Sequence, residues 1–202
     1  MTTRSVLPRK GPVGGPLEAG PTDMDQHLNL TPGPRYGTQV RMVRPSPPIV
    51  DSVLQLIGNT PLVRLRKLAQ PGSADILAKL EARNPGGSVK DRIALAMIER
   101  AEAEGKLGIG SIIVEATAGN TGVSLAMVAA AKGYRLILAI PEDVPAERRR
   151  LFARYGAELV LTSAAQGMAG ADAAAHTLAQ QGPGYFRPHA FENPANPAVH
   201  QQ

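Results

Sequence analysis

Residues Asn84–Arg92 read N-P-G-G-S-V-K-D-R, a Gly-rich turn that leads from a short apolar run into a helical pattern. Ser88 and Asp91 have the spacing of an N-cap and an N3 residue, so they predict a capping-box-like helix start with Asp in place of Glu. Lys90 would then lie in the first helical turn, where the helix dipole disfavours a cation. The uncharged amine is the form that makes a Schiff base with an aldehyde. The alternative interpretation of Lys90 is a solvated surface lysine beside a flexible turn.

A second loop reads T-A-G-N-T-G over Thr117–Gly122, after the apolar strand pattern of Ile112–Val114 and before a helix of small residues. Backbone N–H groups at such a helix start form an anion site, and glycine lets a ligand approach the backbone closely. The loop therefore suits a carboxylate or a phosphate. Asn120 could hydrogen-bond a ligand from the centre of the loop, or it could simply take a left-handed turn conformation, as Asn often does.

Short β-branched runs alternate with small-residue helical patterns after Asp75, which is typical of βαβ units and a parallel sheet. The expected strands are Ile76–Leu80, Ser111–Glu115, Arg135–Ile140, Glu158–Leu161 and Tyr185–Ala190. The expected helices are Ser88–Glu104, Thr121–Lys132, Pro145–Tyr155 and Met168–Gln180. Gly105, Gly133 and Gly156 are expected as C-terminal caps, and Pro145 suits a first helical turn. Ligands bind beyond the carboxyl ends of the strands in such sheets, which places the chemistry in the two loops.

Composition limits the classes of protein that fit. The chain has no cysteine, which excludes disulfides, a Cys nucleophile and a thiolate metal site and fits a reducing cytoplasm. Its four histidines show no metal-ligand spacing, so no metal is expected. The longest apolar stretch, between Ser124 and Ile140, is interrupted by charge and glycine and is too short to cross a membrane. With three Phe, four Tyr and no Trp, the chain lacks a stacking platform for single-stranded nucleic acid.

Residues 1–50 differ in character from the rest. They contain fifteen Gly or Pro and six Lys or Arg against three Asp or Glu, so much of the net charge of +5 lies there. No apolar periodicity could cover a core, which predicts a disordered tail over 1–50. A further hypothesis is that Met42 is the natural start, because the interpretable sequence begins just after it. The intact mass of the endogenous protein tests this hypothesis, and a species that begins at Met1 would contradict it.

Several motifs together resemble the cysteine synthase family, of fold type II among pyridoxal-phosphate enzymes. They are I-G-N-T-P-L-V-R-L (Ile57–Leu65), K-L-E-x-x-N-P-G-G-S-V-K-D-R (Lys79–Arg92), E-A-T-A-G-N-T-G (Glu115–Gly122), E-R-R (Glu147–Arg149), Y-G-A-E-L (Tyr155–Leu159) and G-M-x-G-A (Gly167–Ala171). Their order and spacing look closest to the B-type cysteine synthases, with cystathionine β-synthase a near relative. The resemblance implies a three-layer α/β fold with a parallel sheet, in which 51–202 hold an N-terminal domain and part of a second.

The resemblance also implies roles for single residues. Lys90 would form the Schiff base with pyridoxal 5'-phosphate and remove the α-proton of the substrate, and Asn120 would hydrogen-bond the cofactor's ring hydroxyl. The substrate carboxylate would be held by Thr117, Ala118, Gly119 and Thr121. The implied reaction is a β-replacement that makes L-cysteine from O-acetylserine and sulfide. The alternatives are a related β-eliminase or cystathionine β-synthase-like enzyme, and a non-catalytic member that acts only through subunit interaction.

Two substitutions depart from the family pattern. Ala118 stands where the family usually has Ser, and Ala190 stands where a substrate-contacting Gln is expected. Loss of two hydrogen bonds near a charged group would cost ~1.5–3 kcal/mol each, unless backbone donors or water compensate. The substrate could therefore differ from that of the family. His189 could substitute for the lost Gln or have a structural role.

Family chains continue beyond the position of Gln202 into a domain with a Gly/Thr-rich phosphate loop, and intact members form homodimers. The resemblance thus predicts a longer parent protein; this chain alone would hold the cofactor weakly and expose apolar surface. Arg148–Arg150 are expected on the solvated face of a helix whose other side carries Leu151, Phe152 and Tyr155.

Overall fold

The computed structural model describes residues 49–70 and 72–201. The predictions for the tail and for a start at Met42 therefore fall outside the described residues, except at positions 49 and 50. Of the helices in the described part, none is long and apolar enough to cross a membrane.

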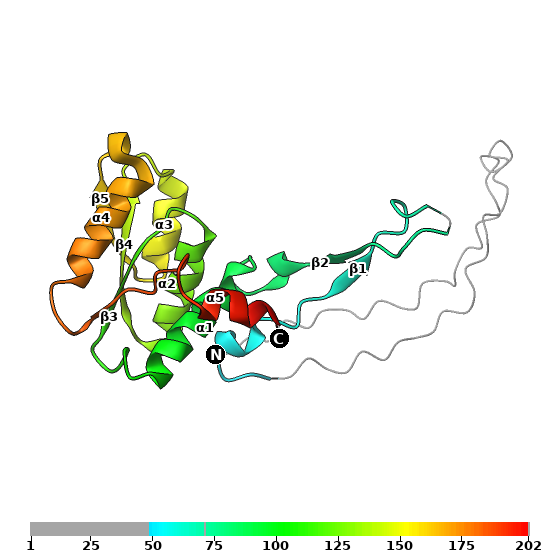
Figure 1. The fold of residues 1–202 in the computed structure, drawn as a ribbon, viewed down its shortest axis with the longest axis horizontal. Helices are drawn as coiled ribbons and strands as arrows, with labels where there is room; N and C mark the ends of the chain where they lie inside the picture. The colour runs from blue at the N-terminus through cyan, green and yellow to red at the C-terminus, as the bar shows by residue number, and fades with distance from the viewer. Residues whose placement is uncertain (1–48, 71, 202) are drawn as a thin grey trace, which may run out of the picture. The chain divides into compact units, whose positions relative to one another are not determined.

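A four-stranded parallel sheet forms the centre of the fold (Figure 1). Its strands are β3 (Ile112–Ala116), β4 (Arg135–Pro141), β5 (Glu158–Thr162) and β6 (Tyr185–Phe186), in the order β5-β4-β3-β6. The predicted parallel sheet is confirmed, and β3, β4 and β5 begin and end within one residue of the expected bounds. The last strand was expected to reach Ala190, which is wrong. It ends at Phe186, because Pro188 has no N–H to donate and His189 adopts a left-handed conformation with φ of 51°.

Helices cover both faces of this sheet. They are α1 (Lys90–Ala103), α2 (Asn120–Lys132), α3 (Ala146–Arg154), α4 (Gly167–Ala179) and the short α5 (Ala195–Ala198). Single 3₁₀ turns lie at η1 (Val53–Leu56), η2 (Glu81–Arg83), η3 (Ala164–Gln166) and η4 (Val199–Gln201). Ile113 and Leu138 pack with α1 and α2, whereas Val114 and Ala139 pack with α4 on the opposite face. This alternation follows from the two-residue period of a strand, and it gives the predicted three layers (Figure 1).

The helix ends agree with the expected caps in all but one case. Gly105, Gly133 and Gly156 all have positive φ at or just after a helix C-cap, as predicted. The placement of Pro145 inside the first turn is wrong: Pro145 is the N-cap, with extended ψ of 137°, and α3 begins at Ala146. A fixed φ suits a cap as well as a first turn, so the sequence did not distinguish the two positions.

The strand expected at Ile76–Leu80 exists as β2 (Leu77–Lys79), but its expected place in the parallel sheet is wrong. It pairs antiparallel with β1 (Leu62–Arg64) in a separate two-stranded sheet, with Leu62 opposite Lys79. Bonds from the Leu80 N–H to the Pro61 carbonyl and from the Leu65 N–H to the Ile76 carbonyl, each 2.9 Å, extend the ladder. The nearby run Leu62–Arg64 thus supplies the partner locally, and a strand pattern alone does not specify a partner.

Candidate active site

A cavity of about 730 Å³ lies beyond the carboxyl end of β3, between the two loops that the sequence singled out. Lys90 lines it from the first loop, and Thr117, Ala118, Gly119, Asn120 and Thr121 line it from the second. All the residues predicted for the site are thus brought together. The volume lies within the range of small-molecule sites. In the part of the chain that the structure describes, no three His, Cys, Asp or Glu side chains are grouped to hold a metal ion.

The start of α1 differs from the predicted capping box. The helix begins at Lys90, whose N–H donates to the Ser88 hydroxyl at 3.1 Å. Asp91 is fully buried and does not reach back to the N–H of Ser88. Its carboxylate instead accepts the Gly86 N–H and the Ser124 hydroxyl, each at 2.5 Å. The capping box is therefore wrong, because a buried hydroxyl on α2 draws the carboxylate away from its own helix end.

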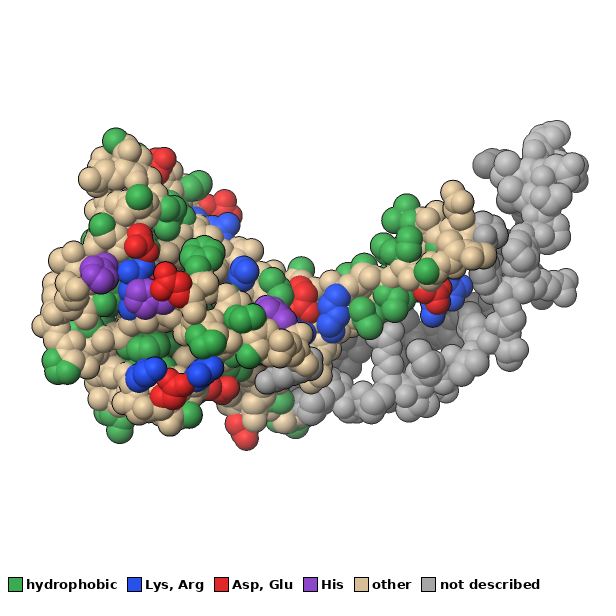
Figure 2. Space-filling view, viewed as in Figure 1, with side chains coloured by type: hydrophobic (Ala, Val, Ile, Leu, Met, Phe, Trp, Pro, Cys, Tyr) green, Lys and Arg blue, Asp and Glu red, His purple; other side chains and the backbone are tan. Residues whose placement is uncertain are grey.

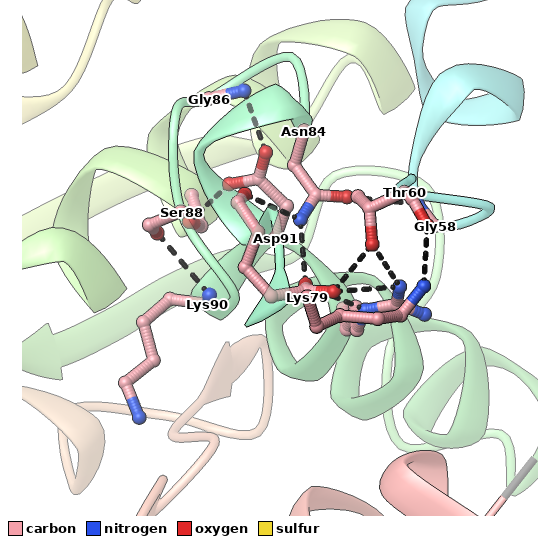
Figure 3. A network of polar contacts seen from close by, with 11 residues as sticks. Gly58, Thr60, Lys79, Asn84, Gly86, Ser88, Lys90 and Asp91 are labelled. Carbon is pink, nitrogen blue, oxygen red and sulfur yellow. Dashed lines mark hydrogen bonds and ion pairs between the residues drawn. The ribbon is translucent and has the colours of Figure 1, made fainter. Parts of the chain in front are cut away.

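The side chain of Lys90 is separate from these contacts. Figure 3 shows it extending away from the hydrogen bonds that fix Ser88, Gly86 and Asp91. Lys90 is half-buried and lines the cavity wall. Its backbone is thus held by the loop while its amine is left to meet a ligand in the cavity. An amine so placed could hold a ligand with an aldehyde group.

A second set of polar contacts connects the segment before β1 with the lysine loop, Asn84–Arg92 (Figure 3). Arg92 donates to both carboxylate oxygens of Glu81, at 2.8 and 3.0 Å. Glu81 also accepts the Thr60 hydroxyl at 2.6 Å and the Asn84 amide at 2.8 Å, and Asn84 accepts the Gly58 N–H at 2.8 Å. The bond from Arg92 is the main cause that lowers the pKa of Glu81 to about 2, against the opposing effect of burial. The same pair raises the pKa of Arg92.

The second loop positions Asn120 as the first residue of α2, after Gly119 as N-cap. The alternative of a left-handed turn at Asn120 is wrong, since Asn59 and His189 are the non-glycine residues with positive φ in the described part. The Asn120 amide oxygen accepts a hydrogen bond from Arg148 Nη1 at 3.0 Å. The side-chain amide of Asn120 therefore lines the cavity in an orientation that its bond from Arg148 fixes.

The basic run on α3 only partly fits the expected solvated face. Phe152 is fully buried and Arg150 is exposed, as expected, but Leu151 is 36% exposed on the side expected to be covered. Arg148 is half-buried and contacts Asn120 across the gap between α3 and α2. Tyr155, the C-cap of α3, is half-buried and packs against the core, as expected.

A buried charged pair in the cavity wall was not predicted from the sequence. Arg187, after β6, lies with its Nε 3.5 Å from Glu115 Oε1 of β3, and the two side chains are 7% and 4% exposed. Arg187 also pairs with Asp172 of α4, and all three residues line the cavity. No local motif joins residues so distant in sequence. The one available signal was a glutamate within the apolar strand I-I-V-E-A, where an unpaired charge would be costly.

The Glu115–Arg187 pair also holds the segment that carries Ala190, the second substitution relative to the family pattern. Glu115 Oε2 accepts the N–H of Ala190 at 3.2 Å. The preceding His189 is left-handed, and its carbonyl accepts the N–H groups of Glu192 and Asn193, each at 2.9 Å. His189 and Ala190 both line the cavity, as does Ala118. Both substituted positions therefore lie where they can affect what the cavity binds.

Comparison with known proteins gives consistent matches over the described fold. The family model for "Pyridoxal-phosphate dependent enzyme" matches residues 53–202. Cysteine synthases of Staphylococcus aureus strains Mu50 and N315 are 56% identical over 152 residues, which are 75% of this chain and 49% of theirs. The chain thus spans about half the length of the curated relatives it matches.

Solved structures agree with this match. The structure of an O-ureido-L-serine synthase is 46% identical with a TM-score of 0.72, over 76% of this chain and 48% of that one. A cysteine synthase from Entamoeba histolytica is 38% identical with a TM-score of 0.75, over 81% of this chain and 50% of that one.

Proposed function

Because this chain belongs to the family of pyridoxal-phosphate-dependent enzymes, we propose that it carries the lysine and the substrate loop of a cysteine synthase. The proposed reaction makes L-cysteine from O-acetylserine, or a similar activated serine, and sulfide. The observation that carries the proposal is that Lys90 and the loop Thr117–Thr121 line one cavity. The identity of 56% to cysteine synthases supports the same reaction.

The residues of the cavity fit the aldehyde and the ring oxygen of the cofactor. A volume of about 730 Å³ accommodates a small ring compound together with an amino acid. Lys90 offers an amine for the aldehyde, and Asn120 offers a side-chain amide for a ring oxygen. When bound, pyridoxal phosphate supplies the electron sink that makes chemistry at the substrate's α and β carbons accessible.

The side chains of this chain supply orientation and proton transfer. Lys90 Nζ would hold the cofactor through its aldehyde, and as a free amine it would take the proton from the substrate's α carbon. The substrate carboxylate binds to Thr117, Gly119 and Thr121 through hydroxyl and backbone N–H groups near the start of α2. Ala118 contributes only its backbone to this loop.

Residues 51–202 are proposed as the enzyme region of a cytoplasmic homodimer, with residues 1–50 as a separate tail. Exposed apolar side chains on the hairpin, such as Leu62 at 58% and Leu77 at 50%, support association with further protein surface.

Borohydride trapping tests the assignment of Lys90. The purified chain is mixed with pyridoxal phosphate and reduced, and mass spectrometry locates the adduct; acetate release and cysteine formation from O-acetylserine and sulfide are measured in parallel. We expect an adduct at Lys90, and its loss together with activity in Lys90→Ala. Lys67→Ala, at an exposed position outside the cavity, is the matched control. A Lys90→Ala variant that keeps both properties would refute the assignment, and a chain without adduct or activity that purifies only in a complex would favour a non-catalytic role.

A second candidate is β-replacement by a nucleophile larger than sulfide. Two observations favour it: Ala118 and Ala190 remove side-chain atoms from the cavity wall, and an O-ureido-L-serine synthase is 46% identical. Competition between sulfide and hydroxyurea for O-acetylserine distinguishes the candidates. O-ureido-L-serine as the main product would support this second candidate, and cysteine alone would support the first.

A further inference from the structure

Asn120 forms a hydrogen bond to one side chain outside the cavity, and Asn120 is the acceptor in that bond. Its Oδ1 accepts from Nη1 of Arg148 at 3.0 Å, and within the described residues this is the one side-chain hydrogen bond of either residue. Asn120 lines the cavity, whereas Arg148 is not among the described residues that line it. Arg148 therefore contacts the amide from outside the cavity lining, through an exposed hydrogen bond.

The chemistry of the two groups fixes the orientation of the amide. A guanidinium has N–H donors and no acceptor, while an amide has one acceptor oxygen and one NH₂ donor group. A flipped Asn120 would set N–H against N–H, so the hydrogen-bond network selects the oxygen for Arg148. The Asn120 Nδ2 group then remains for a ligand. The positive charge of Arg148 beside the Asn120 oxygen also polarises the amide and strengthens its N–H groups as donors.

We propose that Arg148 is a positioning residue that orients Asn120 so that the cavity wall presents a hydrogen-bond donor, and not an acceptor, to the ring oxygen of the cofactor. This inference rests on the proposed function, because it takes pyridoxal phosphate as the ligand. It gives Arg148 a role that the adjacent basic residues do not share. Arg149 and Arg150 form no side-chain hydrogen bond or ion pair within the described residues.

The test compares Arg148→Met and Arg148→Lys with Arg150→Met, a matched change on the exposed side of the same helix. Dissociation constants for pyridoxal phosphate and the visible absorbance of the loaded chain are measured. We expect Arg148→Met to weaken binding about threefold to tenfold, the effect of one lost hydrogen bond. Its absorbance should shift in the same direction as that of Asn120→Ala. Arg148→Lys should restore part of the affinity, and Arg150→Met should match the unsubstituted chain.

An aspartate at position 120 tests the donor requirement separately. Asn120→Asp presents only acceptor oxygens, so it should weaken binding more than Asn120→Ala does. Side-chain amide NMR of the cofactor-free chain provides a readout without pyridoxal phosphate: the Nδ2 resonances of Asn120 should shift in Arg148→Met and not in Arg150→Met.

The outcomes separate the inference from the proposed function. A chain that gives no trapped adduct at Lys90 contradicts the proposed function and, with it, the role of Arg148 toward the cofactor. A chain that binds pyridoxal phosphate through Lys90, with Asn120→Ala impaired but Arg148→Met unchanged, overturns the inference alone. Unshifted Asn120 resonances in Arg148→Met overturn it as well.

Discussion

Gly86 makes room for the buried carboxylate that shapes the lysine loop. A Cβ atom at this position would lie 2.4 Å from Asp91 Oδ1, well inside van der Waals contact. The Gly86 N–H also donates to that carboxylate at 2.5 Å. Gly87, the next residue, has left-handed φ of +83° and open space around it. Gly86 is therefore needed for space, and Gly87 for its backbone conformation.

Gly86→Ala should destabilise the fold by about 1–3 kcal/mol, as overpacking does, because Asp91 would have to move away from Gly86 and Ser124. Urea unfolding measures the change. Gly182→Ala is the control, since a Cβ there meets nothing within 4 Å and φ is not left-handed; a change within about 0.5 kcal/mol is expected. Equal midpoints for the two variants would show that the loop accommodates a methyl group without cost.

Arg187 is the partner that neutralises the buried charge of Glu115. Arg187→Met should cost about 3–5 kcal/mol of stability, because Glu115 would remain as a buried charge without its partner. Adding Glu115→Gln should recover a large part of that loss, since a neutral amide can still accept the Ala190 N–H. A double-mutant cycle by urea unfolding measures the coupling between Arg187 and Glu115, and additive effects would argue against that coupling.

Asp172→Asn, at a side chain 63% exposed, should change stability by about 0–1 kcal/mol in the same unfolding measurement.

At the scale of elements, Glu81 joins the base of the hairpin to α1, and its ionisation should make that junction sensitive to acid. The folded pKa of about 2 lies below the ordinary value of 4.5. Its contribution to stability is therefore complete above pH 4.5 and is lost as the pH falls toward 2.

Unfolding measured from pH 7 to pH 2 should thus show the free-energy difference between the chain and Glu81→Gln shrinking below pH 4.5. Glu147→Gln is the control, because it removes an exposed carboxylate that has no hydrogen bond or ion pair within the described residues. A constant difference across the whole range would exclude ionisation of Glu81 as the cause.

The sequence predicted elements better than it predicted their partners. Strands β3, β4 and β5 and helices α1 to α4 followed from local periodicity, and the two Gly-rich loops followed from their place between a strand and a helix. The pairing of β2 with β1 was not predicted, because a strand pattern does not specify its neighbour. The ion pair of Glu115 with Arg187 depends on the packing of β3 against a segment 72 residues later. The contact of Arg148 with Asn120 likewise depends on how α3 meets α2, which no local spacing encodes.

At the scale of the whole molecule, hydrophobic side chains gather over the hairpin β1–β2 (Figure 2). Leu62, Val63, Ile76 and Leu77 are exposed to between 41% and 58%. An isolated two-stranded hairpin is marginal in water unless another surface covers it. Apolar patches of this kind mark interaction surfaces, so the hairpin is expected to associate with a covering partner.

The double variant Leu62→Thr/Leu77→Thr should therefore reduce self-association of the chain and lower its binding of a hydrophobic dye, while the absorbance of bound pyridoxal phosphate stays unchanged. Light scattering coupled to size exclusion measures the association. Leu161→Thr, equally exposed at 50% but on the edge strand β5, is the matched control. If Leu161→Thr alone dissociates the chain, association runs through the parallel sheet; if neither variant changes its mass, the hairpin does not mediate association.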